Sequence, residues 1–230
     1  MTEEQTTKIL EPSPKICESS IRENSLECVI ELDDFYAFCP GLNELLTLKK
    51  HFPGFKITLF TIPFPAIFMY KGIANDFNMK KYRDWVNVIK QLDWIEIAVH
   101  GVGHLKNEFN CSKIRAKKSL LAIDNVFKRV GLPYVKIFRA PYWQLSQDAL
   151  DVLSEEGWTI ALNPEVPQTF NTKDKMVYYF NWNLKDKYPE GSPLFGHGHL
   201  QDPINGIDKV LSNILELPTN TVFKKLSEQL

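Results

Sequence analysis

The sequence predicts an α/β fold with a mostly parallel sheet, and two observations support that expectation. Strand-like and helix-like segments alternate along the chain, and no repeat or low-complexity linker interrupts them. Such alternation is typical of parallel strands joined by helices that cover the sheet. The 230 residues, 44% of them hydrophobic, suit one domain with a substantial core. We expect residues 1–25 to form a flexible arm and residues 26–230 to form the single domain.

Seven segments have the β-branched and aromatic composition of strands. In chain order they are 28–34, 56–62, 95–99, 135–141, 158–163, 175–182 and 192–197. Between and after them, apolar residues recur at helical spacing. The expected helices are 40–52, 80–92, 112–131, 146–157, 206–217 and a short one at 221–229.

The clearest helix is the segment 112–131. Ser112 is placed to cap its start, and Gly131 is placed to end it. Its expected apolar face consists of Ile114, Leu121, Val126 and Val130.

Composition and charge limit the possible partners and compartments. The formal charge of −1 favours neither a nucleic acid nor a membrane surface as partner. The longest apolar stretch, 57–70, is too short to span a bilayer, and the first residues lack the pattern of a secretory signal. The four cysteines show no CxxC spacing and are expected to be free thiols, so a cytoplasmic location is the expectation.

Ionisable residues gather at the ends of four of the predicted strands. Because the carboxyl ends of parallel strands meet at one edge of a sheet, these residues are expected to converge there. They are Asp33 and Asp34, then His100 and His104 in "HGVGH", then Arg139, and finally His197 in "LFGHGHL".

These residue types suit metal-assisted hydrolysis. Two imidazoles and one carboxylate favour a divalent ion, with zinc as the expected one, and leave positions open for water and substrate. The second aspartate can then act as general base, Arg139 can hold it ionised, and a histidine opposite can protonate the leaving group. Each motif taken alone is weak, since a lone HxxxH is more often a surface pair than a metal site.

Four motifs in this order resemble those of the polysaccharide deacetylases, the NodB-homology family. They are "LDD" at 32–34, "HGVGH" at 100–104, "RAPYW" at 139–143 and "LFGH" at 194–197. The resemblance implies a distorted (β/α) barrel with seven or so strands. It also implies metal-dependent removal of acetyl groups from an N- or O-acetylated carbohydrate.

The resemblance also implies a role for each matching residue. Asp33 corresponds to the catalytic base, Arg139 to the residue that orients it, and His197 to the general acid, with His199 as a close rival. The backbone N–H of Tyr142 corresponds to the donor that holds the oxyanion, and Trp143 is a candidate for lining the sugar pocket. The implied metal ligands are Asp34, His100 and His104.

The sequence departs from the family pattern at three points that bear on activity. The first motif ends in "DDF" instead of a Gly-Pro step, which changes the turn chemistry of the following loop. Gly101 stands where the family has Ser or Thr, which removes a side chain that would brace the loop. No D-x-x-D-W motif follows residue 158, so the acid on the far side of Arg139 is unassigned, with Glu165 as a guess.

Two other functions fit the same residues. A degenerate member of the family would keep the barrel and bind a glycan or a protein without turnover. A related hydrolase would cleave the C–N bond of a small amide. The identity of the substrate and the oligomeric state are not encoded in these motifs.

Overall fold

The computed structural model describes residues 25–39, 41–64, 79–166, 169–200 and 207–230. The expected arm, apart from Ser25, lies outside the described residues. Within the described part, no helix has the length and apolarity needed to cross a membrane.

Nine strands and five helices make up the described fold, together with two 3-10 turns. The strands are β1 (Glu27–Phe35), β2 (Ile57–Thr61), β3 (Ile95–Val99), β4 (Ile137–Arg139), β5 (Thr159–Leu162), β6 (Val177–Tyr179), β7 (Trp182–Asn183), β8 (Leu194–His199) and β9 (Val222–Lys224). The helices are α1 (Leu42–His51), α3 (Met79–Ile89), α4 (Lys113–Val130), α5 (Gln147–Glu155) and α6 (Ile207–Leu215), and the 3-10 turns are η2 (Pro141–Trp143) and η3 (Leu226–Glu228).

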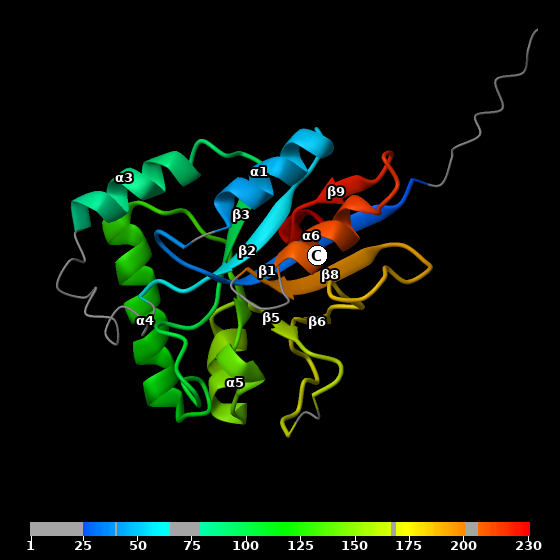
Figure 1. Cartoon of the computed structure of the whole chain (residues 1–230). Coiled ribbons are helices and arrows are strands. Elements are labelled where there is room, and N and C mark those ends of the chain that lie inside the picture. The colour runs from blue at the N-terminus through cyan, green and yellow to red at the C-terminus, as the bar shows by residue number, and fades with distance from the viewer. Residues whose placement is uncertain (1–24, 40, 65–78, 167–168, 201–206) are drawn as a thin grey trace, which may run out of the picture.

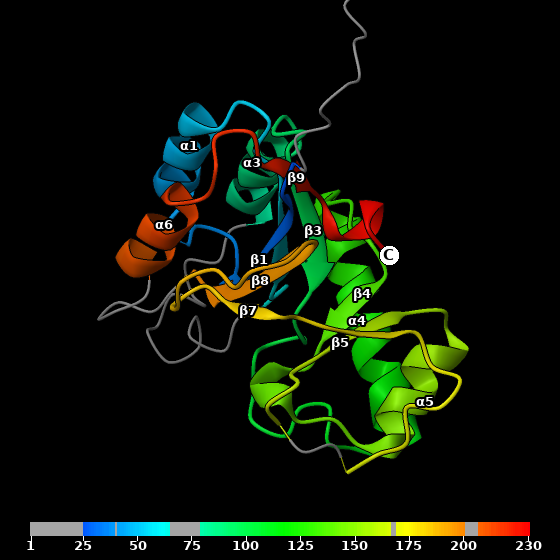
Figure 2. The same cartoon turned by 90° about the vertical axis from the view of Figure 1, so that its right-hand side faces the viewer.

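The strands form one curved parallel sheet. Its order is β6-β5-β4-β3-β2-β1-β8-β7, with β9 paired to the first residues of β1. Every described strand pair is parallel, and Figures 1 and 2 show the sheet curling with the helices outside it. The sheet is thus a partly closed barrel, and the prediction of a distorted (β/α) barrel is confirmed.

Alternation along the strands separates two apolar clusters. Outward-facing residues such as Ile30 and Leu59 pack against the helices in a large core. The inner cluster is much smaller, because charged and polar side chains occupy much of the barrel interior near the carboxyl ends of the strands. Its buried members are Val29, Phe60, Ala98, Ile137, Ala161, Tyr178 and Leu226.

Helix α4 ends as predicted but packs on a different face. Gly131 adopts φ +77° and its N–H bonds back to the carbonyls of Phe127 and Lys128. Ile114 and Leu121, expected on the apolar face, are 71% and 59% exposed, so that expectation was wrong. The face that packs on the sheet consists of Ala116, Leu120, Ile123, Phe127 and Val130.

Two further expectations needed correction. The predicted strand 175–182 is two short strands, β6 and β7. The predicted short helix at 221–229 begins instead as strand β9, because the start of β1 offers unpaired backbone groups, and the Val222 N–H bonds to the Leu26 carbonyl. Leu226 then lies buried in the inner cluster, and its N–H donates to Thr58 Oγ1 at 2.9 Å.

Candidate metal centre and active site

The four sequence motifs converge at one end of the barrel, beyond the carboxyl ends of β1, β3, β4 and β8. They surround a pocket of about 390 Å³. Its walls are formed by Asp33, Asp34, His100, His104, Ala140, Tyr142, Trp143 and His199. His197 does not line this pocket and lies deeper in the barrel.

The three predicted metal ligands face one another across a short gap. Asp34 Oδ1 lies 3.1 Å from His104 Nε2 and 3.6 Å from His100 Nε2. His100 Nδ1 contacts the Arg139 carbonyl at 2.9 Å; since a carbonyl only accepts, Nδ1 carries the proton and Nε2 presents a lone pair to the gap. Asp34 Oδ1 is buried and has no hydrogen-bond donor. A buried carboxylate oxygen beside two imidazole nitrogens is a donor set suited to zinc or a similar divalent ion.

Behind this group, Arg139 holds the second aspartate in a fully buried network. One guanidinium nitrogen donates to Asp33 Oδ1 at 2.6 Å, and the other donates to Glu31 Oε2. That same Glu31 oxygen accepts the Tyr178 hydroxyl proton at 2.6 Å. The Cζ atom of Arg139 also lies 3.8 Å from the centre of the Phe60 ring, so the guanidinium packs on the ring face.

This network sets the ionisation of the two carboxyl groups differently. Burial favours the neutral form of Asp33, but the adjacent Arg139 guanidinium and the neighbouring His100, His197 and His199 together outweigh it, so the pKa of Asp33 lies well below its usual range. For Glu31, burial is the larger effect and raises the pKa above its usual range, although Arg139 and Tyr178 act in the opposite direction. Asp33 is therefore the carboxylate that remains ionised and able to accept a proton near neutral pH.

Glu31 supplies the acid that the motif pattern left unassigned. The guess was Glu165, but Glu165 is exposed in the loop after β5, whereas Arg139 is wholly buried against Glu31. The alternation of β1 contained the signal, because Glu31 lies two residues before Asp33 and so shares its face of the strand. An acid on the inner face of a central strand requires a buried cationic partner.

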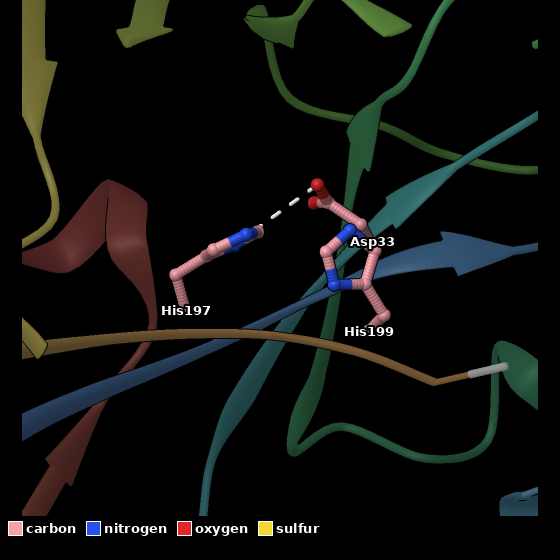
Figure 3. A group of neighbouring side chains, drawn as sticks. All are labelled: Asp33, His197 and His199. Atoms are coloured by element: carbon pink, nitrogen blue, oxygen red, sulfur yellow. Dashed lines mark ion pairs between the residues drawn. The ribbon is translucent and has the colours of Figure 1, made fainter. Parts of the chain in front are cut away.

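The two histidines of β8 occupy different environments around Asp33 (Figure 3). Arg139 Nη1 lies 3.1 Å from His197 Nδ1, and because a guanidinium only donates, Nδ1 accepts and the proton of His197 is on Nε2. Burial is the largest effect on His197 and lowers its pKa to about 3. The Asp33 carboxylate acts in the opposite direction, and the positive charge of Arg139 lowers the pKa further. His199 is half-buried and lines the pocket.

Asp33, His197 and His199 could also be considered as a second ligand set, since their donor atoms lie within 4.8 Å of one another. His197 is not suited to bind a metal ion, because its Nδ1 accepts from Arg139 and its Nε2 carries the proton.

The neighbouring glycines have a packing role. A side chain on Gly196 or Gly198 would meet Leu184 on the outer face of β8.

The "RAPYW" turn contributes the aromatic wall of the pocket. Tyr142 and Trp143 have φ values of 55° and 60°, which non-glycine residues adopt at a cost of roughly 1–2 kcal/mol each. This backbone aims the exposed Tyr142 ring at His104, 4.8 Å between centroids. It packs the Trp143 ring against His197 at 5.2 Å and places both residues at the pocket, as expected.

The "HGVGH" loop is held by a residue that the motif reading missed. Glu108 is buried, and its carboxylate accepts the N–H of Gly103 at 2.9 Å and that of Val102 at 3.2 Å. Gly101 has φ +71°, and a side chain there would overlap Glu108 Oε2 and the Pro141 ring. The Gly101 departure is thus matched by an acid that fills the space.

Comparison with solved structures supports the predicted barrel fold. Peptidoglycan deacetylase PdaC from Bacillus subtilis has a TM-score of 0.57 at 16% identity over 89% of this chain and 90% of that one. An acetyl xylan esterase of family 4 from Clostridium thermocellum, solved with a cobalt ion, has a TM-score of 0.54 at 17% identity over 88% and 89%. A family 4 carbohydrate esterase from Streptomyces lividans, with acetate, has a TM-score of 0.52 at 13% identity over 87% and 91%. The chain therefore has the fold of the family 4 carbohydrate esterases and polysaccharide deacetylases.

Sequence comparison adds less. No family model matches the chain. An uncharacterized protein from Methanocaldococcus jannaschii is 29% identical over 100 residues, which is 42% of this chain and 40% of that protein. The match thus spans about two-fifths of the length of that relative.

Proposed function

We propose that this protein is a metal-dependent hydrolase that removes acetyl groups from an acetylated carbohydrate. The observation that carries the proposal is the unpartnered Asp34 Oδ1 facing His100 and His104, beside an arginine-held Asp33 in an open pocket. A divalent ion bound there supplies Lewis-acid polarisation of a water molecule and of the acetyl carbonyl. The donor set suits zinc, and a structural neighbour was solved with cobalt.

The residues around this centre divide the work of hydrolysis. Asp33, kept ionised by Arg139, accepts the proton of the attacking water. The N–H groups of Trp143 and Gln144 bond to the carbonyls of Ala140 and Pro141, so the Tyr142 N–H is the amide of this turn assigned to the developing oxyanion. Trp143 and Tyr142 offer ring faces to the sugar.

His199 is assigned as the proton donor to the leaving group, in place of His197. His199 lines the pocket, whereas His197 is buried with a protonless nitrogen engaged by Arg139. We expect His199→Asn to lower kcat by about 10²-fold or more, since general acid catalysis contributes that much. His197→Asn, the matched variant on the same strand, should have the smaller effect on kcat. The opposite ranking in steady-state assays would return the role to His197.

The proposal is tested by metal analysis together with an acetate-release screen over N- and O-acetylated sugars. We expect about one equivalent of divalent metal per chain, loss of acetate release on chelation, and recovery on adding Zn²⁺ or Co²⁺. His104→Ala should lose both metal and activity, because it removes one of three protein ligands. Full metal content in this variant would refute the assigned ligand set.

The same screen separates the alternatives. Metal binding without acetate release from any sugar, but with hydrolysis of small amides, would indicate the related C–N hydrolase. Metal binding with no turnover would indicate a degenerate binding protein. The missing fourth motif is not an argument for a degenerate binding protein, because Glu31 occupies the position beside Arg139.

A further inference from the structure

The loop that carries His104 has residues in the left-handed backbone region. His104 has φ +59°, a left-handed conformation that a histidine seldom adopts, and its ring is partly exposed. Gly101 and Gly103, on either side of Val102, give the loop little intrinsic stiffness. A ligand that must meet Asp34 and His100 in one geometry therefore needs external support.

The Glu108 side chain holds the backbone of this loop through hydrogen bonds. Its two carboxylate oxygens divide between two successive amides, Oε2 accepting from Val102 and Oε1 from Gly103. The N–H groups of His104 and Leu105 also favour the ionised form of this carboxylate, although burial is the larger effect and raises the pKa of Glu108 above its usual range. Successive N–H groups that converge on one anion fix the backbone between them, as in the anion-binding concavities called nests.

The same side chain links the loop to the neighbouring motif. Glu108 fills the space in front of Gly101 together with Pro141, the second residue after Arg139. Nearby, the Asn107 N–H donates to Gln144 Oε1 at 2.8 Å, and Phe109 pairs with Leu145. The loop after β3 and the loop after β4 thus contact each other at Glu108, Asn107 and Phe109.

We propose that Glu108 is a positioning residue for metal binding, which takes over the bracing role of the Ser or Thr that Gly101 replaces. The inference rests on the proposed metal centre. The new element is Glu108, four residues past His104. We expect Glu108 to control metal affinity by fixing the loop backbone, without contributing a ligand atom.

The test compares two isosteric changes at equally buried acids. In Glu108→Gln, one carboxylate oxygen becomes an NH₂ group that faces a backbone N–H, so one amide loses its acceptor. Glu96→Gln makes the same change at the far end of strand β3, where Glu96 accepts from Thr58 Oγ1 and the Ser227 N–H. Both are buried, at 6% and 7% exposure, so a general loss of stability affects both.

Zinc affinity is measured by competition with a chromogenic chelator, together with the thermal midpoint of each metal-free protein. We expect Glu108→Gln to bind Zn²⁺ at least about 10-fold more weakly than wild type, in the range seen for outer-shell partners. Glu96→Gln should bind Zn²⁺ like wild type even where its midpoint falls. Wild-type affinity in Glu108→Gln, or equal weakening in both variants, would overturn the inference.

A second variant covers the case in which Glu108→Gln does not fold. Gly101→Ser restores the residue type of the family pattern, yet its Cβ would collide with Glu108 and Pro141. We expect it to weaken Zn²⁺ binding, and wild-type or tighter binding would count against the proposal. If wild type itself binds no Zn²⁺, the proposed function fails first, which distinguishes that outcome from failure of the Glu108 assignment alone.

Discussion

Arg139→Met should lower the free energy of unfolding by about 3–5 kcal/mol, the usual cost of removing one partner from a buried ion pair. Arg139 is wholly buried and donates to both Asp33 and Glu31. Without the cation, two carboxyl groups 0% and 1% exposed must protonate or remain charged in a low-dielectric interior. Urea denaturation of the metal-free protein near neutral pH measures the effect.

Two control variants separate charge from geometry. Arg139→Lys retains the charge but cannot reach both acids with one ammonium, so it should recover only part of the loss. Tyr178→Phe removes one hydrogen bond to Glu31 and should cost only about 1 kcal/mol. A destabilisation below about 1 kcal/mol in Arg139→Met would show that the network is not the stabilising unit described.

The order of the motifs was enough to predict which strands meet, because parallel strands bring their carboxyl ends to one edge. Asp34, His100 and His104 lie together for that reason, and Arg139 reaches Asp33 across the barrel. The partly closed, curved sheet follows from the same alternation of strand and helix, which places the helices outside and leaves the interior to side chains of alternate residues.

The supporting residues were harder to predict because their types are common elsewhere. Glu31 sits within an apparently ordinary buried strand, and Tyr178 resembles the other aromatic residues of a core. Glu108 lies in a polar loop where an acid is unremarkable. Glu31 and Tyr178 act through contacts with residues distant in the sequence, and Glu108 acts through backbone N–H groups, so residue type alone does not reveal these roles. The local signal for Glu31 was the alternation of β1, which places it on the same face as Asp33.

The helix-face error on α4 has a similar cause. Ile114 and Leu121 are seven residues apart, so they share a side of the helix, and residue type does not distinguish Leu121 from Leu120. Leu120 belongs to the face whose i, i+3, i+4 pattern includes Ala116, Ile123 and Phe127. The longer series of regularly spaced residues decides which face packs.

The two adjacent aspartates have different surroundings. Asp33 Oδ1 accepts from the Arg139 guanidinium, whereas Asp34 Oδ1 faces His100 and His104 and has no hydrogen-bond donor. The adjacent aspartates must therefore divide their roles, one binding the metal and the other remaining free to accept a proton.

That division gives the last prediction, tested on neighbouring residues with the same substitution. Asp33→Asn should keep about one equivalent of metal and lower kcat by about 10²–10⁴-fold, because an amide cannot accept the proton. Asp34→Asn should instead lose most of the metal, since a neutral amide oxygen is a far weaker zinc ligand than a carboxylate. Metal content is measured by elemental analysis after dialysis, and kcat by acetate release. Normal turnover in Asp33→Asn would place the base elsewhere, and full metal retention in Asp34→Asn would remove it from the ligand set.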